Sequence, residues 1–84
     1  MKACVFEDLG KISYQEIDKP TMKKDEVLLK VKACGICSSD LDRVFKNGAY
    51  HYPIVLGHEI AGQIIDVADE KNKAYIGKKA VVFP

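Results

Sequence analysis

The chain has 84 residues, of which 48% are hydrophobic and 30% charged, and its formal net charge is +1. This length allows one small domain, which buries only about 60% of the surface that the unfolded chain exposes. The near-neutral charge excludes a general attraction to nucleic acid or anionic membranes. No apolar run approaches the roughly 20 residues of a membrane span, and the apolar run near the N-terminus is too short for a signal peptide.

The cysteine content indicates the compartment. The chain contains three cysteines, at positions 4, 34 and 37. Secreted disulfide frameworks usually contain an even number of cysteines. An odd number favours a reducing compartment, where cysteines tend to serve metals or chemistry. We therefore expect a cytoplasmic protein.

The first third of the chain predicts β-structure. The runs Ala3–Glu7 and Lys11–Ile17 flank a turn-forming glycine and predict a hairpin-like pair of strands. Lys19-Pro20 breaks this pattern, and a solvated loop follows. Apolar residues then alternate from Val27 to Ala33, which predicts a third strand with one buried face.

A short helix is predicted over Ser38–Lys46. Its apolar face has i, i+3, i+4 spacing and consists of Leu41, Val44 and Phe45. We expect Ser38 or Ser39 to cap the helix, with Asp42 in the third position after Ser39. Asn47-Gly48 predicts a left-handed stop at its end.

The remaining sequence predicts further strands. A β-rich run covers Ile60–Val67, a polar turn covers Asp69–Asn72, and a last strand covers Lys79–Phe83. Together, the predicted elements are mostly strands with one helix, and the sequence contains no internal repeat. This pattern suggests a small, partly open barrel.

The residues with distinctive chemistry begin at Cys37, just before the predicted helix. Backbone N–H groups at a helix start favour an anion and lower the pKa of a thiol. His58 lies 21 positions further on, with Glu59 beside it. Zinc accepts sulfur, imidazole nitrogen and carboxylate oxygen, and a catalytic zinc uses about three protein ligands and one open position. The spacing alone is therefore a moderate indication of a zinc site.

Two segments resemble the zinc signature of the zinc-dependent medium-chain alcohol dehydrogenases. They are Gly35–Asp40, which reads GICSSD, and Gly57–Gly62, which reads GHEIAG. The longer stretch from Asp42 to Glu59 is most similar to the galactitol-1-phosphate and sorbitol-type polyol dehydrogenases of that family. The resemblance covers nearly the whole chain. It implies a mainly β, partly open GroES-like barrel with one short helix, of which residues 1–84 are the N-terminal, zinc-binding segment.

The same resemblance implies a role for each matching residue. Cys37 and His58 match ligands of the catalytic zinc, and Glu59 matches an acidic residue beside the metal that binds it in some members. Ser39 matches the hydroxyl that takes the proton from the substrate alcohol. Asp40 matches a carboxylate that orients a metal ligand. The implied reaction transfers a hydride between a secondary alcohol and NAD or NADP, which makes the partners small molecules such as polyols or sugar phosphates.

Several parts of the family's machinery are absent from these 84 residues. The six glycines form no G-x-G-x-x-G motif, so no dinucleotide-binding domain is present. In the family, the third zinc ligand and the cysteines of a structural zinc lie further downstream. We therefore expect a fragment with half a catalytic site, which is inactive alone and is prone to self-association through exposed strand edges.

Two positions depart from the family pattern. Lys78 stands where family members usually have an aspartate after glycine, so the contacts of that aspartate must be supplied in another way. Asp42 stands where some alcohol dehydrogenases place a histidine of the proton relay. The outer end of the relay is therefore left open.

Alternative roles remain for individual residues. Cys34 and Cys37 form a C-x-x-C that could be a redox pair, or Cys34 could lend its sulfur to zinc. Ser39 could act only as a helix cap. His51 is expected to be a loop residue, with a substrate contact as its alternative role. Two cations are candidates for binding the phosphate of a sugar-phosphate substrate, Arg43 and Lys46.

The main alternative function is non-enzymatic. A GroES-like barrel could serve as a zinc-binding or assembly module without turnover, or as a co-chaperonin-like oligomer. A co-chaperonin has no use for Cys37, His58 and Glu59 together. Zinc content before and after replacement of Cys37 and His58 would therefore separate the two functions.

Overall fold

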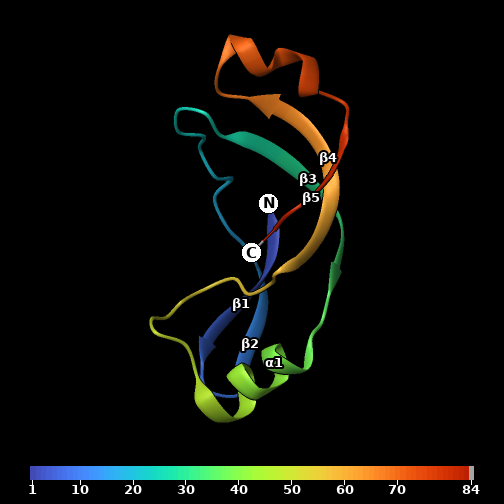
Figure 1. The fold of residues 1–84 in the computed structure, drawn as a ribbon. Coiled ribbons are helices and arrows are strands. Elements are labelled where there is room, and N and C mark those ends of the chain that lie inside the picture. The colour runs from blue at the N-terminus through green and yellow to red at the C-terminus, as the bar shows by residue number, and fades with distance from the viewer. Residues whose placement is uncertain (84) are drawn as a thin grey trace. The chain divides into compact units, whose positions relative to one another are not determined.

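The structure, a computed structural model, describes residues 1–83, so the last residue of the predicted segment, Pro84, lies outside it. The chain divides into two compact units, each with its own sheet (Figure 1). The first unit comprises residues 1–19 and 36–57, and the second comprises residues 20–35 and the described residues from 58 onward. No helix within residues 1–83 is long and apolar enough to cross a membrane.

The sheet of the first unit contains two strands, β1 (Lys2–Asp8) and β2 (Lys11–Glu16). They pair antiparallel, from Lys2 opposite Glu16 to Asp8 opposite Lys11. Gly10 closes the turn between them with a φ of 73°, in the left-handed region that glycine enters without a steric penalty. The predicted hairpin-like pair is therefore confirmed, with strand ends shifted by one residue.

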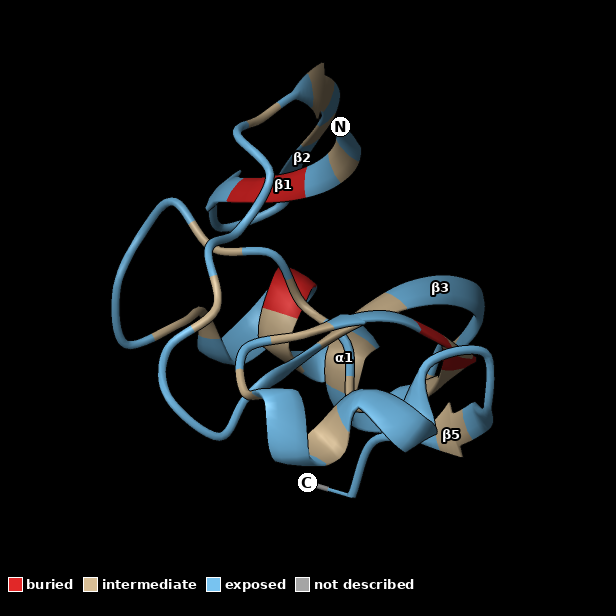
Figure 2. Cartoon of the chain, turned by 90° about the horizontal axis from the view of Figure 1, so that it is seen from above, coloured by how far each residue is buried: buried red, intermediate tan, exposed pale blue. Residues whose placement is uncertain are grey.

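Phe6 forms the centre of the first unit's core. Its side chain is only 1% exposed, and β1 carries one of the few buried segments in the cartoon (Figure 2). Its ring meets the ring of Tyr52 edge to face, with centroids 5.0 Å apart and an interplanar angle of 80°. Its backbone N–H donates to the carbonyl of Ile54 at 2.8 Å and its carbonyl accepts from the N–H of Ile54 at 3.1 Å. These contacts hold residues 52–54 against β1.

Tyr52 also reaches the loop that precedes it. Its hydroxyl oxygen accepts a hydrogen bond from the backbone N–H of Ala49 at 3.1 Å. A Cβ at Gly48 would lie 2.6 Å from the same hydroxyl, so glycine leaves the space that the tyrosine fills. One aromatic side chain therefore connects the loop to the core.

The predicted helix consists of two segments, α1 (Ser38–Asp42) and the π-helical turn η1 (Arg43–Asn47). Gly48 ends it with a φ of 73° and donates its N–H to the carbonyl of Arg43 at 2.7 Å, which confirms the predicted left-handed stop. The predicted apolar face is only partly buried. Val44 is 5% exposed, but Phe45 is 64% exposed, because a π-helical turn changes the period on which i, i+3, i+4 spacing depends.

The predicted N-cap is wrong. The cap is Cys37, whose backbone is extended at φ −88° and ψ 157°, and the helix begins at Ser38. The acidic residue three positions later is Asp40, which therefore takes the place expected for Asp42. Cysteine is not a preferred N-cap residue, so the sequence pattern favoured the serines instead.

The sheet of the second unit has the order β3-β4-β5 with antiparallel pairing throughout. The strands are β3 (Val27–Gly35), β4 (Glu59–Val67) and β5 (Lys79–Val81), with β4 the long curved strand of Figure 1. The last strand ends at Val81, whereas the sequence pattern predicted an end at Phe83. The predicted polar turn is instead a 3-10 helix, η2 (Glu70–Tyr75), whose ends are closed by i to i+3 hydrogen bonds such as the one from Ile76 N–H to Lys73 O at 3.2 Å.

The prediction that β3 has one buried face is wrong. Val27 is 42% exposed and Val31 is 56% exposed, although both lie on the predicted inner face. The register against β4 shifts twice, between Leu28 and Leu29 and between Val31 and Ala33. Each shift breaks the period of two, so alternate residues no longer share one face.

The predicted fold class is confirmed. The structure is mainly β, with five strands in a two-stranded and a three-stranded sheet among residues 1–83. These strands form no closed barrel within the described part of the chain, as expected for part of a GroES-like domain.

Glu16 at the end of β2 gives a prediction for the pH dependence of stability. Its carboxylate accepts a hydrogen bond from the Met1 ammonium at 2.9 Å and lies 3.2 Å from Lys2 Nζ. The hydrogen bond from the N-terminal ammonium, followed by that from Lys2, lowers the pKa of Glu16 below its ordinary 4.5. A carboxyl with a lowered folded pKa stabilises the fold above its unfolded pKa and loses that contribution as pH falls through the folded pKa.

We therefore expect an NMR titration to give Glu16 a lower pKa than a glutamate in an unstructured peptide. Lys2→Met should move this pKa back toward 4.5, since it removes one of the two hydrogen-bonding cations. A matched change at an uninvolved lysine, Lys11→Met, should leave it where it was. An ordinary pKa for Glu16 in the folded chain would contradict the interaction.

Candidate metal centre

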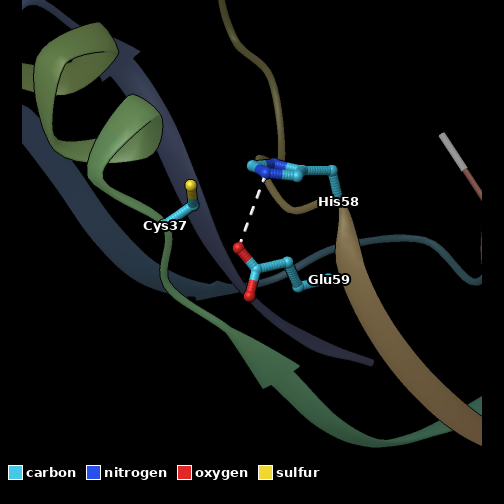
Figure 3. Close-up of side chains that lie close together, drawn as sticks. All are labelled: Cys37, His58 and Glu59. Atoms are coloured by element: carbon cyan, nitrogen blue, oxygen red, sulfur yellow. Dashed lines mark ion pairs between the residues drawn. The ribbon is translucent and has the colours of Figure 1, made fainter.

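Cys37 is held in place by its position at the start of α1 in the first unit (Figure 3). Its backbone N–H donates to Oδ2 of Asp40 at 3.0 Å, and the N–H of Asp40 donates to the carbonyl of Cys37 at 3.0 Å. This reciprocal pair fixes the backbone of Cys37 and hence the root of its side chain. The side chain is half-buried.

His58 and Glu59 lie at the beginning of β4 in the second unit. Nε2 of His58 is 3.7 Å from Oε2 of Glu59, the ion pair drawn as a dashed line in Figure 3. The pair is charged on both sides only when the imidazole is protonated. The side chains are 36% and 51% exposed, so a metal ion or substrate can reach both from solvent.

Gly35 provides the space that the Glu59 carboxylate occupies. The two residues are Cα partners across the β3–β4 ladder. A Cβ at Gly35 would lie 2.7 Å from Oε1 of Glu59 and 3.2 Å from its Cβ. The sequence pattern indicated Gly35 only as the first residue of the Gly35–Asp40 segment. Its position two residues before Cys37 was the available signal for a role in the site.

Ser39 lies in the first turn of α1 and lines a cavity of about 400 Å³ within the first unit. The other lining residues are Asp42, Arg43, Asn47, Gly48, Ala49 and Tyr50. One of the two candidate phosphate-binding cations, Arg43, is therefore in the cavity lining. The other, Lys46, pairs with Asp42 at 3.7 Å and does not line the cavity.

The structure therefore forms three local groups from the predicted site residues. Cys37 is hydrogen-bonded to Asp40, and His58 forms an ion pair with Glu59. Ser39 and Arg43 line the same cavity. Cys37 belongs to the first unit, whereas the histidine and glutamate belong to the second. His51, expected to be a loop residue, is exposed and lies outside the cavity lining.

The donor atoms offered by Cys37, His58 and Glu59 fit zinc. A thiolate, an imidazole and a carboxylate are the three ligand types that protein-bound zinc uses. Calcium and magnesium prefer all-oxygen sites, so a set that contains sulfur and nitrogen disfavours them. Cys34 is a less suitable donor, because its thiol is exposed and contacts the neighbouring carbonyl of Gly35 at 3.8 Å.

The comparison with protein families gives the class of the chain. Residues 23–84 match the family of the alcohol dehydrogenase GroES-like domain. The chain belongs to this domain family, which confirms the resemblance carried by the Gly35–Asp40 and Gly57–Gly62 segments.

Individual relatives are alcohol and polyol dehydrogenases. Galactitol 1-phosphate 5-dehydrogenase of Escherichia coli K12 is 40% identical over 85 residues, covering 100% of this chain and 25% of that protein. Sorbitol dehydrogenase of Bacillus subtilis is 37% identical over 89 residues, covering 100% and 25%. A solved structure from Sinorhizobium meliloti 1021, provisionally described as a zinc-binding dehydrogenase and bound to NADP, is 31% identical with a TM-score of 0.82, covering 93% and 23%. The chain spans about a quarter of the length of the curated relatives it matches.

Proposed function

We propose that residues 1–84 are the N-terminal part of the catalytic domain of a zinc-dependent dehydrogenase, which transfers a hydride between a secondary alcohol and NAD or NADP. The substrate class is a polyol or polyol phosphate. The observation that carries the proposal is a zinc-compatible donor set, Cys37, His58 and Glu59, in a member of the alcohol dehydrogenase GroES-like domain family. Nucleotide binding is assigned to sequence outside these residues.

Covalent geometry supports a shared metal ion for Cys37 and Glu59. Gly35 and Glu59 are antiparallel ladder partners, whose Cα atoms are about 4.5–5.5 Å apart in such pairs. Cys37 follows Gly35 by two residues, and each peptide adds at most about 3.8 Å. The Cα atoms of Cys37 and Glu59 are thus kept within about 13 Å by the chain itself. The chain connection thus limits how far apart the two donor side chains can lie.

The roles of the residues follow from the chemistry of alcohol oxidation. The substrate carbon gives up a hydride to the nicotinamide, and its hydroxyl gives up a proton, which leaves a carbonyl group. A zinc ion bound by Cys37, His58 and Glu59 would supply Lewis acidity that polarises the alcohol or carbonyl oxygen. Ser39 relays the hydroxyl proton: its oxygen accepts that proton while its own hydroxyl proton passes on to solvent, a role for which its exposed position in the cavity lining is suited.

Asp40 and Glu59 act next to these groups. Asp40 is a positioning residue, because its carboxylate holds the backbone of Cys37 through the 3.0 Å hydrogen bond. Glu59 lies beside His58 and serves as a further ligand or as a carboxylate next to the metal. Both roles of Glu59 require the space that Gly35 leaves open.

The cellular setting and the activity of the chain alone complete the proposal. Cys4 and Cys34 are exposed free thiols, which supports a reducing, cytoplasmic compartment. The 84 residues hold only part of a catalytic site and no nucleotide-binding motif. We therefore propose that this chain alone has no dehydrogenase turnover. Turnover by the purified chain with NAD or NADP and a polyol would contradict that part.

Zinc binding tests the donor set directly. We expect the purified chain to bind about one zinc ion, measured by atomic spectroscopy after equilibration and gel filtration. Loss of a residue that only supports a metal ligand lowers metal affinity about 10–100-fold. Cys37→Ser and His58→Ala each remove a ligand, so each should lower the zinc affinity by more than this. Cys34→Ser is the matched control, because it removes the same thiol three positions away and should leave the zinc content unchanged. Zinc content that survives both ligand changes would overturn the proposal.

A further inference from the structure

The three-stranded sheet of the second unit carries lysines on one of its faces. Gln63 in the central strand β4 lies opposite Lys30 of β3 and also opposite Lys79 of β5. Side chains that lie directly opposite each other in an antiparallel ladder point to the same face. The three residues therefore share one face, with a lysine on each outer strand.

A groove of about 480 Å³ lies on this face. Two lysines line it, Lys32 and Lys79, and none of its described lining residues is acidic. The rest of the lining is small or apolar, except for Gln63, whose side-chain N–H donates to the carbonyl of Gly77 at 2.9 Å. The groove is therefore an apolar floor with positive charge beside it.

The lysine charges on this face are not neutralised within the described chain. Among residues 1–83, no carboxylate lies within 4.0 Å of the ammonium group of Lys30, Lys32 or Lys79. Glu59 has the same alternation along β4 as Gln63, but it is paired with His58 and does not line the groove. The face therefore attracts a negatively charged partner.

Strand β5 offers an open backbone edge beside the groove, because it stands at the end of the order β3-β4-β5. The carbonyl of Lys78 and the N–H of Val82 each form a 2.9 Å hydrogen bond with β4. Backbone groups alternate in direction along a strand, so Lys79 and Val81 direct their N–H and C=O groups away from β4. A strand that joins this edge can therefore pair with both residues.

We propose that this edge and the lysine-bearing groove bind an extended acidic segment of a partner protein, which joins the sheet as an additional antiparallel strand. An acidic residue opposite Lys79 forms a cross-strand ion pair, and an apolar residue opposite Val81 covers a side chain that is 73% exposed. Main-chain hydrogen bonds supply the affinity and these two side chains the specificity. Read from its N-terminus, the preferred segment is apolar-x-acidic.

Like charges disfavour a second copy of the chain as the occupant. Pairing of two β5 edges brings a second set of the same lysines beside the first. Lysines on an edge strand commonly prevent such pairing between identical chains. An acidic partner turns the same charges into an attraction.

The test titrates the ¹⁵N-labelled chain with the peptide acetyl-Thr-Val-Thr-Glu-Thr-amide and follows the backbone signals by NMR. We expect the amides of Lys79 and Val81 to shift more than that of Ala80, because only the first two donate to the added strand. Replacing the peptide's glutamate by lysine should weaken binding about fivefold or more, since an attractive pair becomes a repulsive one. Equal affinity for the two peptides would overturn the inference.

N-methylated peptides test the main-chain pairing without changing the chain. Methyl groups on the valine and glutamate nitrogens remove the N–H groups that face β5, so the affinity should fall about tenfold or more. A methyl group on the nitrogen of the central threonine, which faces away from β5, should change the affinity by less than about twofold. Equal losses from both modifications would show that no strand is added.

Substitutions in the chain test the charge. Lys79→Gln should abolish the preference for the glutamate peptide over the lysine peptide. The matched control is Lys24→Gln, which removes the same charge from the loop before β3, outside the groove lining, and should keep that preference. A preference that survives Lys79→Gln undiminished would contradict the assigned ion pair.

The remaining outcomes separate this inference from its alternatives. Shifts of the same amides that grow with chain concentration in the absence of peptide would identify a second copy as the occupant, and the acidic partner would be rejected. Cys37→Ser should abolish zinc binding and leave peptide binding unchanged, because Cys37 does not line the groove. The peptide site and the proposed metal centre can therefore fail independently of each other.

Discussion

Phe6→Ala is expected to cost about 3–5 kcal/mol in the free energy of unfolding, the range for removing a buried aromatic side chain. Phe6 is 1% exposed and is the largest fully buried side chain of the described residues. Its ring is also the partner of Tyr52. Native proteins have only about 5–15 kcal/mol of stability, so this loss removes a large share of it. Urea denaturation followed by circular dichroism measures it.

A matched control is available on the partner strand. Tyr14 in β2 is also aromatic but 71% exposed, so Tyr14→Ala should cost no more than about 1 kcal/mol. Phe6→Leu should fall between the two, because leucine refills part of the cavity. Equal losses for Phe6→Ala and Tyr14→Ala would show that Phe6 is not the centre of the core.

Gly62→Ala is the second substitution with a large expected effect, because it should force β3 and β4 apart. Gly62 in β4 lies opposite Val31, and an added Cβ would overlap the carbonyl oxygen of Lys30 and stand 3.0 Å from Cγ of Leu29. The nearest atom belongs to the backbone and cannot rotate away. We expect a loss of about 1–3 kcal/mol, the usual cost of overpacking. In a domain of this size that lowers Tm by roughly 4–8 °C per kcal/mol, which thermal denaturation measures.

A double-mutant cycle identifies the source of that loss. Leu29→Ala removes the flexible neighbour but leaves the Lys30 carbonyl where it is. If the backbone contact dominates, Gly62→Ala should cost nearly the same in the Leu29→Ala background as in the original chain. Complete recovery of stability in the double variant would show that the side chain, and not the ladder, limits the space.

Local sequence signals predicted most of the elements. Two short runs around a turn-forming glycine indicated the first two strands, and alternating apolar residues indicated the long strand before Gly35. Turn chemistry identified Gly10 and Gly48, whose φ values are both 73°. The exposed residues of β3 could not be predicted, because two register shifts against β4 decide which face each side chain takes. The π-helical turn after Asp42 also lies beyond local pattern, since α-helical spacing assumes one uniform period.

The candidate site was predictable as a set of residues but not as an arrangement. The Gly-His-Glu segment and Cys37 indicated the family, and the family match over residues 23–84 confirms it. The space at Gly35 depends on which residue of β4 lies opposite, which only the register of the sheet determines. Likewise, Ser39 and Arg43 were separate candidates, and the path of the helix brings them to one cavity. Metal binding at these residues remains a prediction.

The dual contact of Tyr52 has a consequence for motion in the chain. Its ring packs on Phe6, while its hydroxyl holds the amide of Ala49, a residue of the cavity lining. The loop cannot swing outward unless the ring leaves the core or the hydrogen bond breaks. The free energy of local opening at the cavity rim is therefore coupled to that of the hydrophobic core. Substitutions that loosen the core should change how fast small molecules enter and leave, even where no lining residue changes.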